Sequence, residues 1–298
     1  MARRQVTTRG GIFDVAPPEL FFIASAAAQY TGAVIAVGLF DRLSPATVAW
    51  VRVLSAGLII TAFSWRHLNP RWTRRDVVAA AAFGISTALM NLTFYLAIER
   101  LPLGKGVTIE FIGPITVAAL RTRTRRNAVA LALAAVGVVI LGGVEIGSEP
   151  LGLVFILLAS VMWAGYIVIG SKVAMADRGI AGLGVGLVIG GIVIAPFGAS
   201  DAGIAFTHID VFFAAVMVGV LSNAIGYGID QSTLRRIPVR RFSLLLALLP
   251  VCAAVFGFLF LDQTPTIVDL AGMLLVLTGV AVQERETIER RHLEAESI

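Results

Sequence analysis

The sequence predicts an all-α integral membrane protein, built from ten transmembrane helices arranged as two inverted five-helix repeats. Three observations predict this fold class: the composition, the number of long apolar segments and an internal repeat. Hydrophobic residues make up 57% of the 298 residues and charged residues 14%, and the mean hydropathy is +0.87. A soluble domain contains about 45–50% apolar and about 25% charged residues. The chain has too little polar surface for water, so its solvent is predicted to be lipid.

Ten apolar segments have about the length of a membrane-spanning helix, which needs roughly 20 residues to cross a hydrocarbon core about 30 Å thick. They run approximately over residues 18–40, 46–65, 76–98, 103–120, 127–144, 151–171, 180–198, 210–231, 239–261 and 266–283. Short connections with turn-forming pairs such as Ser44-Pro45 separate them. The first segment exceeds the core of a signal peptide, about 7–15 residues, so we interpret it as a spanning helix.

The positions of the basic residues predict that both termini are cytoplasmic, because cytoplasmic loops carry an excess of Lys and Arg. With the N-terminus inside, the inner loops and tails hold 20 of the 24 Lys and Arg residues, and the outer loops keep Arg42, Arg100 and Lys105. Residues 1–17 are then a cytoplasmic segment. Residues 284–298 are a charged cytoplasmic tail, either a short helix or disordered.

An internal repeat divides the chain into two halves. Arg100-Leu101-Pro102 recurs as Arg236-Ile237-Pro238, and Pro114 recurs as Pro250 at the same spacing. The predicted repeats are residues 18–145 and 150–283. Each contains five helices, an odd number, so the second must enter the membrane from the opposite face. Inverted repeats of this kind are typical of transporters, with the substrate site near the midplane.

Two ionisable residues lie deep inside predicted spans, where an unpaired charge is costly. Arg52 could bind a substrate carboxylate through two hydrogen bonds, or it could snorkel to the headgroups or tie two helices together. Glu110 lies four residues before Pro114, which removes a backbone donor and should kink the helix there. A carboxyl beside a loosened turn could load a proton or bind an ammonium group. The alternative is a structural glutamate paired with Arg52 or Lys105.

Four amphipathic residues within predicted spans could line a cavity, namely Asn91, Tyr95, Trp163 and Tyr166. Aromatic residues at such positions also serve as packing or lipid-interface residues. Lys105 is expected at the outer interface. The glycines at 182, 186 and 190 predict a face for close helix packing.

The sequence predicts neither an enzyme nor a metal or cofactor site. Its three histidines are far apart, and the nucleotide-binding and hydrolase motifs are missing. The basic residues occupy short gaps between apolar segments, which excludes a nucleic-acid partner. Uphill transport would therefore draw on an ion gradient or a partner.

Specific residues around the third and fourth segments resemble a known family. They are Phe94-Tyr95-Leu96-Ala97-Ile98, Leu101-Pro102-Leu103-Gly104 and Ile109-Glu110-Phe111-Ile112-Gly113-Pro114, supported by Arg52 and by Trp163-Ala164-Gly165-Tyr166-Ile167. The chain resembles the drug/metabolite transporter superfamily of the EamA type, most closely the threonine/homoserine exporters. Two positions depart from that family: Lys105 replaces a small or aliphatic residue, and no acidic residue precedes Pro250.

The resemblance implies a multi-pass protein of the plasma (inner) membrane that exports small amino acids or related metabolites, coupled to protons. Its partners would be a small-molecule substrate, the lipid bilayer and protons. Efflux of drugs or other metabolites is an alternative within the same superfamily. A non-transporting scaffold or a lipid-modifying enzyme is the alternative from a different class, and the internal repeat argues against the scaffold.

Overall fold

A computed structural model describes residues 18–64, 72–121, 124–174, 179–226, 229 and 248–296. Every regular element in these ranges is helical, which confirms the predicted all-α class. The helices are α2 (Pro18–Leu39), α3 (Pro45–Ser64), α4 (Arg74–Ile98), α5 (Leu103–Glu110), α6 (Ile112–Arg121), α7 (Arg125–Ser148), α8 (Pro150–Ala174), α9 (Gly179–Gly198), α10 (Ala202–Thr207), α11 (Ile209–Gly219), the π-helix η2 (Val220–Gly226), α14 (Leu248–Phe260) and α15 (Ile267–Glu296).

The helices begin where the sequence supplies starting signals. Pro45 and Pro150 are the first residues of α3 and α8, where the missing N–H costs nothing and the fixed φ already suits a helix. Thr73 and Asp76 form a capping box at the start of α4, which satisfies two backbone donors that have no partner within the helix. Local chemistry therefore sets these boundaries.

Two predicted segments are not continuous α-helices. Segment 103–120 is divided at Phe111 into α5 and α6, which confirms the break expected from Pro114. Segment 210–231 begins as α11 and widens into the π-helix η2. The charged tail continues α15 as a helix to Glu296. Of the predicted segment 239–261, the part before Leu248 lies outside the described residues.

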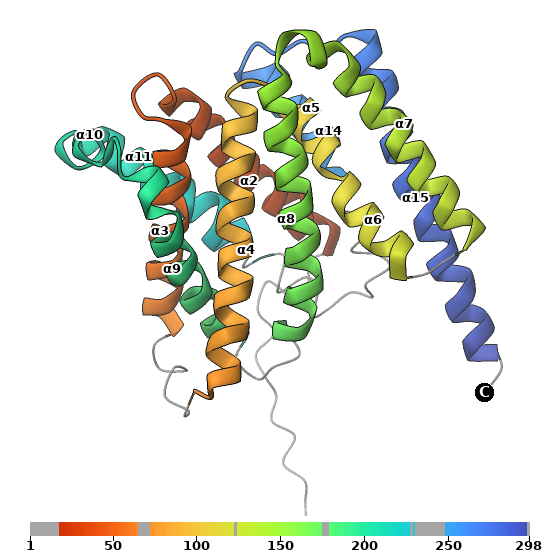
Figure 1. The fold of residues 1–298 in the computed structure, drawn as a ribbon, viewed down its shortest axis with the longest axis horizontal. Helices are drawn as coiled ribbons and strands as arrows, with labels where there is room; N and C mark the ends of the chain where they lie inside the picture. The colour runs from red at the N-terminus through yellow and green to blue at the C-terminus, as the bar shows by residue number, and fades with distance from the viewer. Residues whose placement is uncertain are drawn as a thin grey trace, which may run out of the picture.

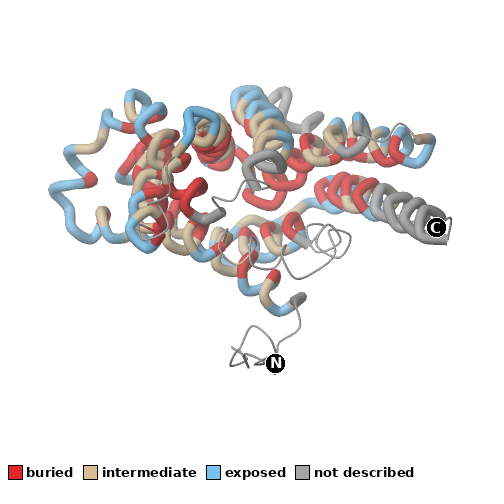
Figure 2. The backbone as a smooth tube through the Cα atoms, turned by 90° about the horizontal axis from the view of Figure 1, so that it is seen from below, coloured by how far each residue is buried: buried red, intermediate tan, exposed pale blue. Residues whose placement is uncertain are grey.

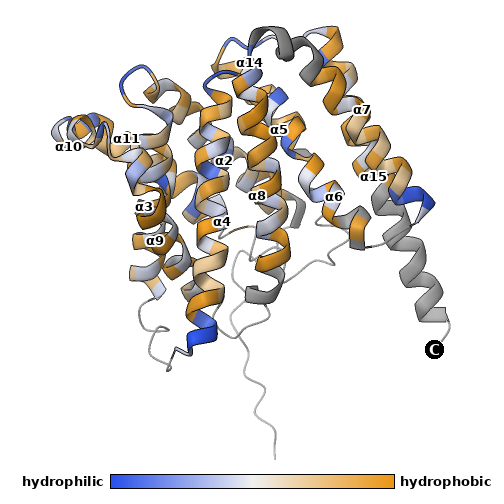
Figure 3. Ribbon diagram, viewed as in Figure 1, coloured by the Kyte–Doolittle hydropathy of each residue, from blue (hydrophilic) through white to orange (hydrophobic). Residues whose placement is uncertain are grey.

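The burial of side chains is the reverse of that in a soluble protein. Large apolar side chains such as Phe63 and Ile267 are more than four-fifths exposed, whereas Arg52, Lys105 and Glu110 are buried. Figure 3 shows that apolar residues predominate along most of the helices, and Figure 2 shows exposed residues distributed over many of them. An exposed apolar surface of this extent requires lipid around it. Helices are one of the two structures that satisfy every backbone group there.

Among the residues that the structure describes, six helices are long and apolar enough to cross a membrane: Leu20–Leu39, Pro45–Ser64, Arg74–Ile98, Pro150–Ile169, Ala181–Gly198 and Ile209–Gly226. Two shorter apolar helices, Leu249–Phe260 and Ile267–Val282, accompany them. The long helices stand roughly side by side, and α7 lies alongside α15 at one edge of the molecule (Figure 1). The short α10 lies at one end of the bundle.

Glycines bring α4 and α9 into close contact, as the glycine positions predicted. A Cβ on Gly190 would lie 2.3 Å from the carbonyl oxygen of Gly84, and one on Gly186 would lie 2.5 Å from that of Ala80. Real Cβ atoms do not approach so closely, so larger residues would force these helices apart. Packing of small residues stabilises helix pairs in membranes, where apolar burial between helices brings little gain.

Candidate functional site

Arg52 is held inside the helix bundle by a hydrogen bond between the two halves of the chain. Its Nε donates to Oδ1 of Asn223 at 2.8 Å, and its guanidinium carbon lies 4.9 Å from the centroid of the Tyr95 ring. Arg52 comes from α3, Tyr95 from α4 and Asn223 from η2. The aromatic face and the amide oxygen both favour a cation at this position. Arg52 therefore does not snorkel to the headgroups.

Close helix contact and a π-helical turn place Asn223 beside Arg52. A Cβ on Gly219 would lie 2.5 Å from the carbonyl oxygen of Arg52, so α11 approaches α3 as nearly as two backbones can. The hydroxyl of Ser222 donates to the carbonyl oxygen of Gln29 on α2 at 3.1 Å. Single π-turns inside α-helices occur frequently at functional sites.

Glu110 is the last residue of α5, directly before the break at Phe111. Pro114 has no N–H to give to the carbonyl of Glu110, so the helix restarts only at Ile112. The side chain is 7% exposed. Its carboxylate makes no hydrogen bond or ion pair within the described part of the chain, and the charge of Arg52 acts on it from beyond ion-pair distance. The alternative of a glutamate paired with Lys105 is wrong.

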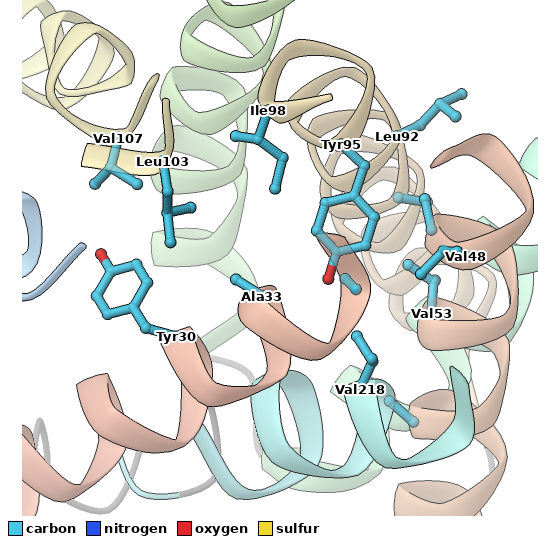
Figure 4. Packing of buried hydrophobic residues seen from close by; sticks show 14 of the residues in the cluster. Tyr30, Ala33, Val48, Val53, Leu92, Tyr95, Ile98, Leu103, Val107 and Val218 are labelled. Atoms are coloured by element: carbon cyan, nitrogen blue, oxygen red, sulfur yellow. The ribbon is translucent and has the colours of Figure 1, made fainter. Parts of the chain in front are cut away.

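Within the described residues, Nδ2 of Asn223 is buried and has no hydrogen-bond partner. The buried Tyr95 hydroxyl makes no well-formed hydrogen bond there, but it interacts with the neighbouring Arg52 guanidinium. Both residues are fully buried. Figure 4 shows the Tyr95 hydroxyl pointing away from its own helix, toward the helices that carry Ala33 and Val218. A buried polar group without a partner costs about 1–3 kcal/mol. We call Arg52, Tyr95, Glu110 and Asn223 the central cluster.

The other predicted residues lie around the central cluster with partners of their own. The Asn91 amide donates to the carbonyl oxygen of Thr87 in its own helix at 2.8 Å. The Trp163 ring packs edge-on against Phe111 at 5.0 Å, and Tyr166 packs against Phe83 at 4.8 Å. Trp163 therefore adjoins the helix break beside Glu110. Asn91 bonds to its own helix and Tyr166 packs against Phe83.

Lys105 is buried by the protein and paired, rather than exposed to an interface, while its depth near the outer boundary stays a prediction. Its Nζ lies 2.8 Å from Oδ1 of Asp269 at the start of α15. The other carboxylate oxygen of Asp269 accepts the backbone N–H of Thr266 at 3.0 Å and its hydroxyl at 2.8 Å. Sequence distance from the segment end suggested exposure, but the partner of Lys105 comes from the far end of the chain.

Sequence reasoning missed Asn223 and Asp269. Asn223 stands in the apolar stretch Val220–Gly226, where its polar side chain was a usable signal. Asp269 is an acidic residue three positions after Thr266, inside a predicted span. The spacing of Thr266 and Asp269 also indicates a helix cap. It gives no indication that Asp269 pairs with Lys105.

The central cluster can bind opposite charges at once. A guanidinium pairs well with a carboxylate, and a carboxylate without a partner can take a proton or an ammonium group. Within the described ranges, no group of three or more His, Cys, Asp or Glu side chains could hold a metal ion. The site is thus suited to a small charged molecule.

Comparison with known proteins decides the family. The sequence profile of the EamA-like transporter family matches twice, over residues 17–146 and 150–283. The chain belongs to the EamA-like transporter family. The two matches together span almost all of the apolar sequence, and the chain is therefore a membrane transporter with two copies of the family's repeat.

Individual relatives of this EamA-like protein agree with that assignment. The threonine/homoserine exporter RhtA of Escherichia coli K12 is 33% identical over 267 residues, covering 88% of this chain and 89% of the exporter. RhtA of Salmonella typhimurium LT2 is 32% identical with the same coverage. An uncharacterised inner membrane transporter of Salmonella typhimurium, YicL, is 26% identical over 262 residues, covering 80% of this chain and 85% of YicL.

A solved crystal structure shares the fold of the EamA-like chain. It covers 89% of this chain and 96% of its own length with a TM-score of 0.57, at 16% sequence identity.

Proposed function

We propose that this EamA-like transporter exports small amino acids or related metabolites of the threonine and homoserine type across the plasma (inner) membrane. The relatives at 32–33% identity are threonine/homoserine exporters and cover nearly nine-tenths of this chain. The observation that carries the proposal is the central cluster, in which the Arg52 guanidinium and the Glu110 carboxylate, unpaired within the described residues, are both buried and interact from beyond ion-pair distance. An amino acid carries the two complementary charges.

The proposed architecture is ten spanning helices in two inverted repeats, residues 18–145 and 150–283. The packing of the helices supports it, because exchanging the two halves leaves the main contacts in place. Corresponding helices pack together in α3–α9, α5–α14 and α7–α15. The contacts α4–α8 and α4–α9 have counterparts in α11–α2 and α11–α3.

A pair of serines supports the same repeat. Ser86 donates to the carbonyl oxygen of Met162 at 2.9 Å, and Ser222, its counterpart at the repeat spacing, donates to that of Gln29 at 3.1 Å. Each hydroxyl thus joins the third helix of one half to the first helix of the other. If both termini are cytoplasmic and successive loops alternate between the two sides of the membrane, then Arg42, Arg100 and the start of α5 lie on the outer side.

Transport would proceed by alternating access of the two halves around the central cluster. Arg52 binds the substrate carboxylate, and Glu110 binds either the ammonium group or the coupling proton. Tyr95 and Trp163 line the path, and Asn91 and Tyr166 stay candidates for its walls. No covalent step is required, so the protein acts as a carrier and not as an enzyme. The Glu110 carboxylate would be charged when it binds the ammonium group and protonated when the substrate is absent, and this exchange would couple transport to protons.

Uptake of labelled threonine and homoserine into inside-out vesicles tests the proposal, with and without an imposed proton gradient. We expect accumulation above vesicles that lack the protein, and more of it with the gradient. If folded protein is present and neither amino acid accumulates, the amino-acid assignment is wrong and efflux of other metabolites or drugs takes its place. Accumulation without an effect of the gradient would reject proton coupling alone.

A further inference from the structure

The side-chain oxygen of Asn223 forms a hydrogen bond within the described structure, whereas its side-chain nitrogen forms none. Its Oδ1 accepts from Arg52 at 2.8 Å, while its Nδ2 is buried without an acceptor in the described structure. Asn223 has no exposed surface. A donor left unpaired at full burial is unfavourable, and in a native structure it calls for an explanation such as a bound water, an ion or a functional role.

The hydrogen bond to Asn223 also restricts how Arg52 can bind an anion. It uses Nε, so a ligand would bind to the terminal nitrogens of the guanidinium, beside the Tyr95 hydroxyl that also interacts with Arg52. Two terminal guanidinium nitrogens bind a carboxylate through two parallel hydrogen bonds. A carboxylate oxygen has lone pairs for a further donor, which Nδ2 of Asn223 can supply.

The position of Asn223 couples the two halves at this point. It stands on η2 in the second half, whereas Arg52 stands on α3 in the first. The Ser25 hydroxyl donates to the carbonyl of Gly226 at 3.0 Å, at the end of the same π-helical segment. Asn223 is thus held by its own helix rather than by a flexible loop.

We propose that Asn223 is a substrate-binding residue that donates from Nδ2 to the carboxylate held by Arg52, and that it selects substrates with a free carboxylate. This inference rests on the proposed transport function and adds a residue that recognises the carboxylate of the substrate. With Glu110 in the same cluster, the substrate class is a small zwitterion. The Tyr95 hydroxyl, buried beside Arg52, is available to a second polar group of the substrate.

A purely structural asparagine makes a different prediction. If Asn223 only ties η2 to α3, replacing it lowers stability and weakens every ligand by a similar factor. A carboxylate-binding asparagine instead weakens acids more than the matching amides. The ratio of the two affinities separates these roles.

The test measures binding of L-threonine, L-threoninamide and propionate to the purified full-length transporter in lipid nanodiscs. The variants are Asn223→Asp, which keeps an oxygen for Arg52 but removes the donor, and Asn223→Ala, which removes both. Thr87→Val is the matched control. Thr87 is the counterpart of Asn223 in the first repeat, is equally buried, and already donates to the carbonyl oxygen of Phe83 in its own helix at 2.8 Å.

We expect the wild type and Thr87→Val to prefer threonine over threoninamide. Asn223→Ala should bind threonine about tenfold more weakly or worse, with a smaller change for threoninamide, because a hydrogen bond to a charged group contributes about 1.5–3 kcal/mol. Asn223→Asp should reverse the preference toward threoninamide, because its carboxylate repels the acid. Since Asp has the shape of Asn, this variant gives the answer even if Asn223→Ala fails to fold.

Equal losses for threonine and threoninamide, or no loss, would overturn the inference while leaving the transport function intact. If wild type binds propionate through Asn223 but does not bind threonine, the role of Asn223 holds and the amino-acid substrate is wrong. If folded wild type binds no carboxylate at all, both are wrong.

Discussion

The transporter buries two sets of polar side chains, and they differ in how completely their atoms are paired. In the Lys105–Asp269 pair, the ammonium meets a carboxylate whose second oxygen accepts two hydrogen bonds from Thr266. In the central cluster of the described structure, Glu110 has no such partner, Nδ2 of Asn223 is buried without an acceptor, and the buried Tyr95 hydroxyl interacts with Arg52 without a well-formed hydrogen bond. Buried polar groups that are well paired make a structure rigid. We propose that the incompletely paired groups of the central cluster bind a ligand instead.

The difference follows from where the partners come from. The Lys105–Asp269 pair joins α5 to α15, and the Gln263 side chain reinforces the same contact by accepting from the backbone N–H of Leu103 at 2.8 Å. The central cluster lies at the break between α5 and α6 and at the π-helical turn, where regular hydrogen bonding is interrupted. Irregular backbone at membrane depth is tolerated where it is buried in protein or lines a cavity.

The largest effect is expected from Glu110→Gln, which keeps the shape of the side chain and removes its charge and its exchangeable proton. Because transport requires that carboxylate to take an ammonium group or a proton, uptake into inside-out vesicles should fall to that of vesicles without the protein. The folded fraction is measured by size-exclusion chromatography of the same preparation. Full uptake by correctly inserted protein would exclude this role of Glu110.

A large but partial effect is expected from Arg52→Lys. Lysine keeps the positive charge but loses the hydrogen bond from Nε to Asn223 and the paired donors that match a carboxylate. Substrate affinity should fall by about tenfold or more, consistent with the loss of a charged hydrogen bond of about 1.5–3 kcal/mol. Competition of unlabelled threonine against labelled threonine gives the affinity, and an unchanged value would show that Arg52 acts only as a charge.

Replacing Lys105 should affect stability rather than transport. Lys105→Met leaves Asp269 charged and buried without its partner, which costs about 3–5 kcal/mol. Thermal unfolding in detergent should show a clear decrease in the midpoint. Adding Asp269→Asn removes the leftover charge while keeping an oxygen for Thr266, and it should restore most of the loss. A double variant as unstable as the single one would show that the charges themselves are not what matters.

The smallest effect is expected at Asp201, outside the spanning helices. The backbone N–H of Ser44 donates to its carboxylate at 2.8 Å, and this bond, with the Ser44 hydroxyl, holds the pKa of Asp201 below its usual range. The stability difference between wild type and Asp201→Ala should be constant at neutral pH and shrink below about pH 4, as the carboxyl is protonated. Unfolding curves at several pH values measure it, and a difference that grows at low pH would contradict the assignment.

The sequence predicted what depends on composition and local chemistry. An arginine and a glutamate inside apolar segments marked Arg52 and Glu110, and Pro114 predicted the break at Phe111. Pairings between distant segments could not be predicted in this way. The burial of Lys105 was not predicted because its partner, Asp269, lies in the other half of the chain. The π-helix likewise depends on how α11 packs against α2 and α3.

The role of neutral polar residues was the hardest to predict. Asn91 and Asn223 are both asparagines within apolar helices, yet one bonds to its own backbone and the other to Arg52 from the opposite half. The repeat spacing aligns Asn223 with Thr87, but not with any charged residue. Only the arrangement of helices distinguishes a bonded amide from one with a free donor.

Threonine uptake by two variants, normalised to folded protein and measured below their unfolding temperatures, tests the contrast between the two polar sets most directly. The variants are Glu110→Gln and the double variant Lys105→Met with Asp269→Asn. The account predicts uptake at background for the first and near that of wild type for the second. Uptake preserved in Glu110→Gln and abolished in the folded double variant would contradict it, and would move the transport site to the Lys105–Asp269 pair.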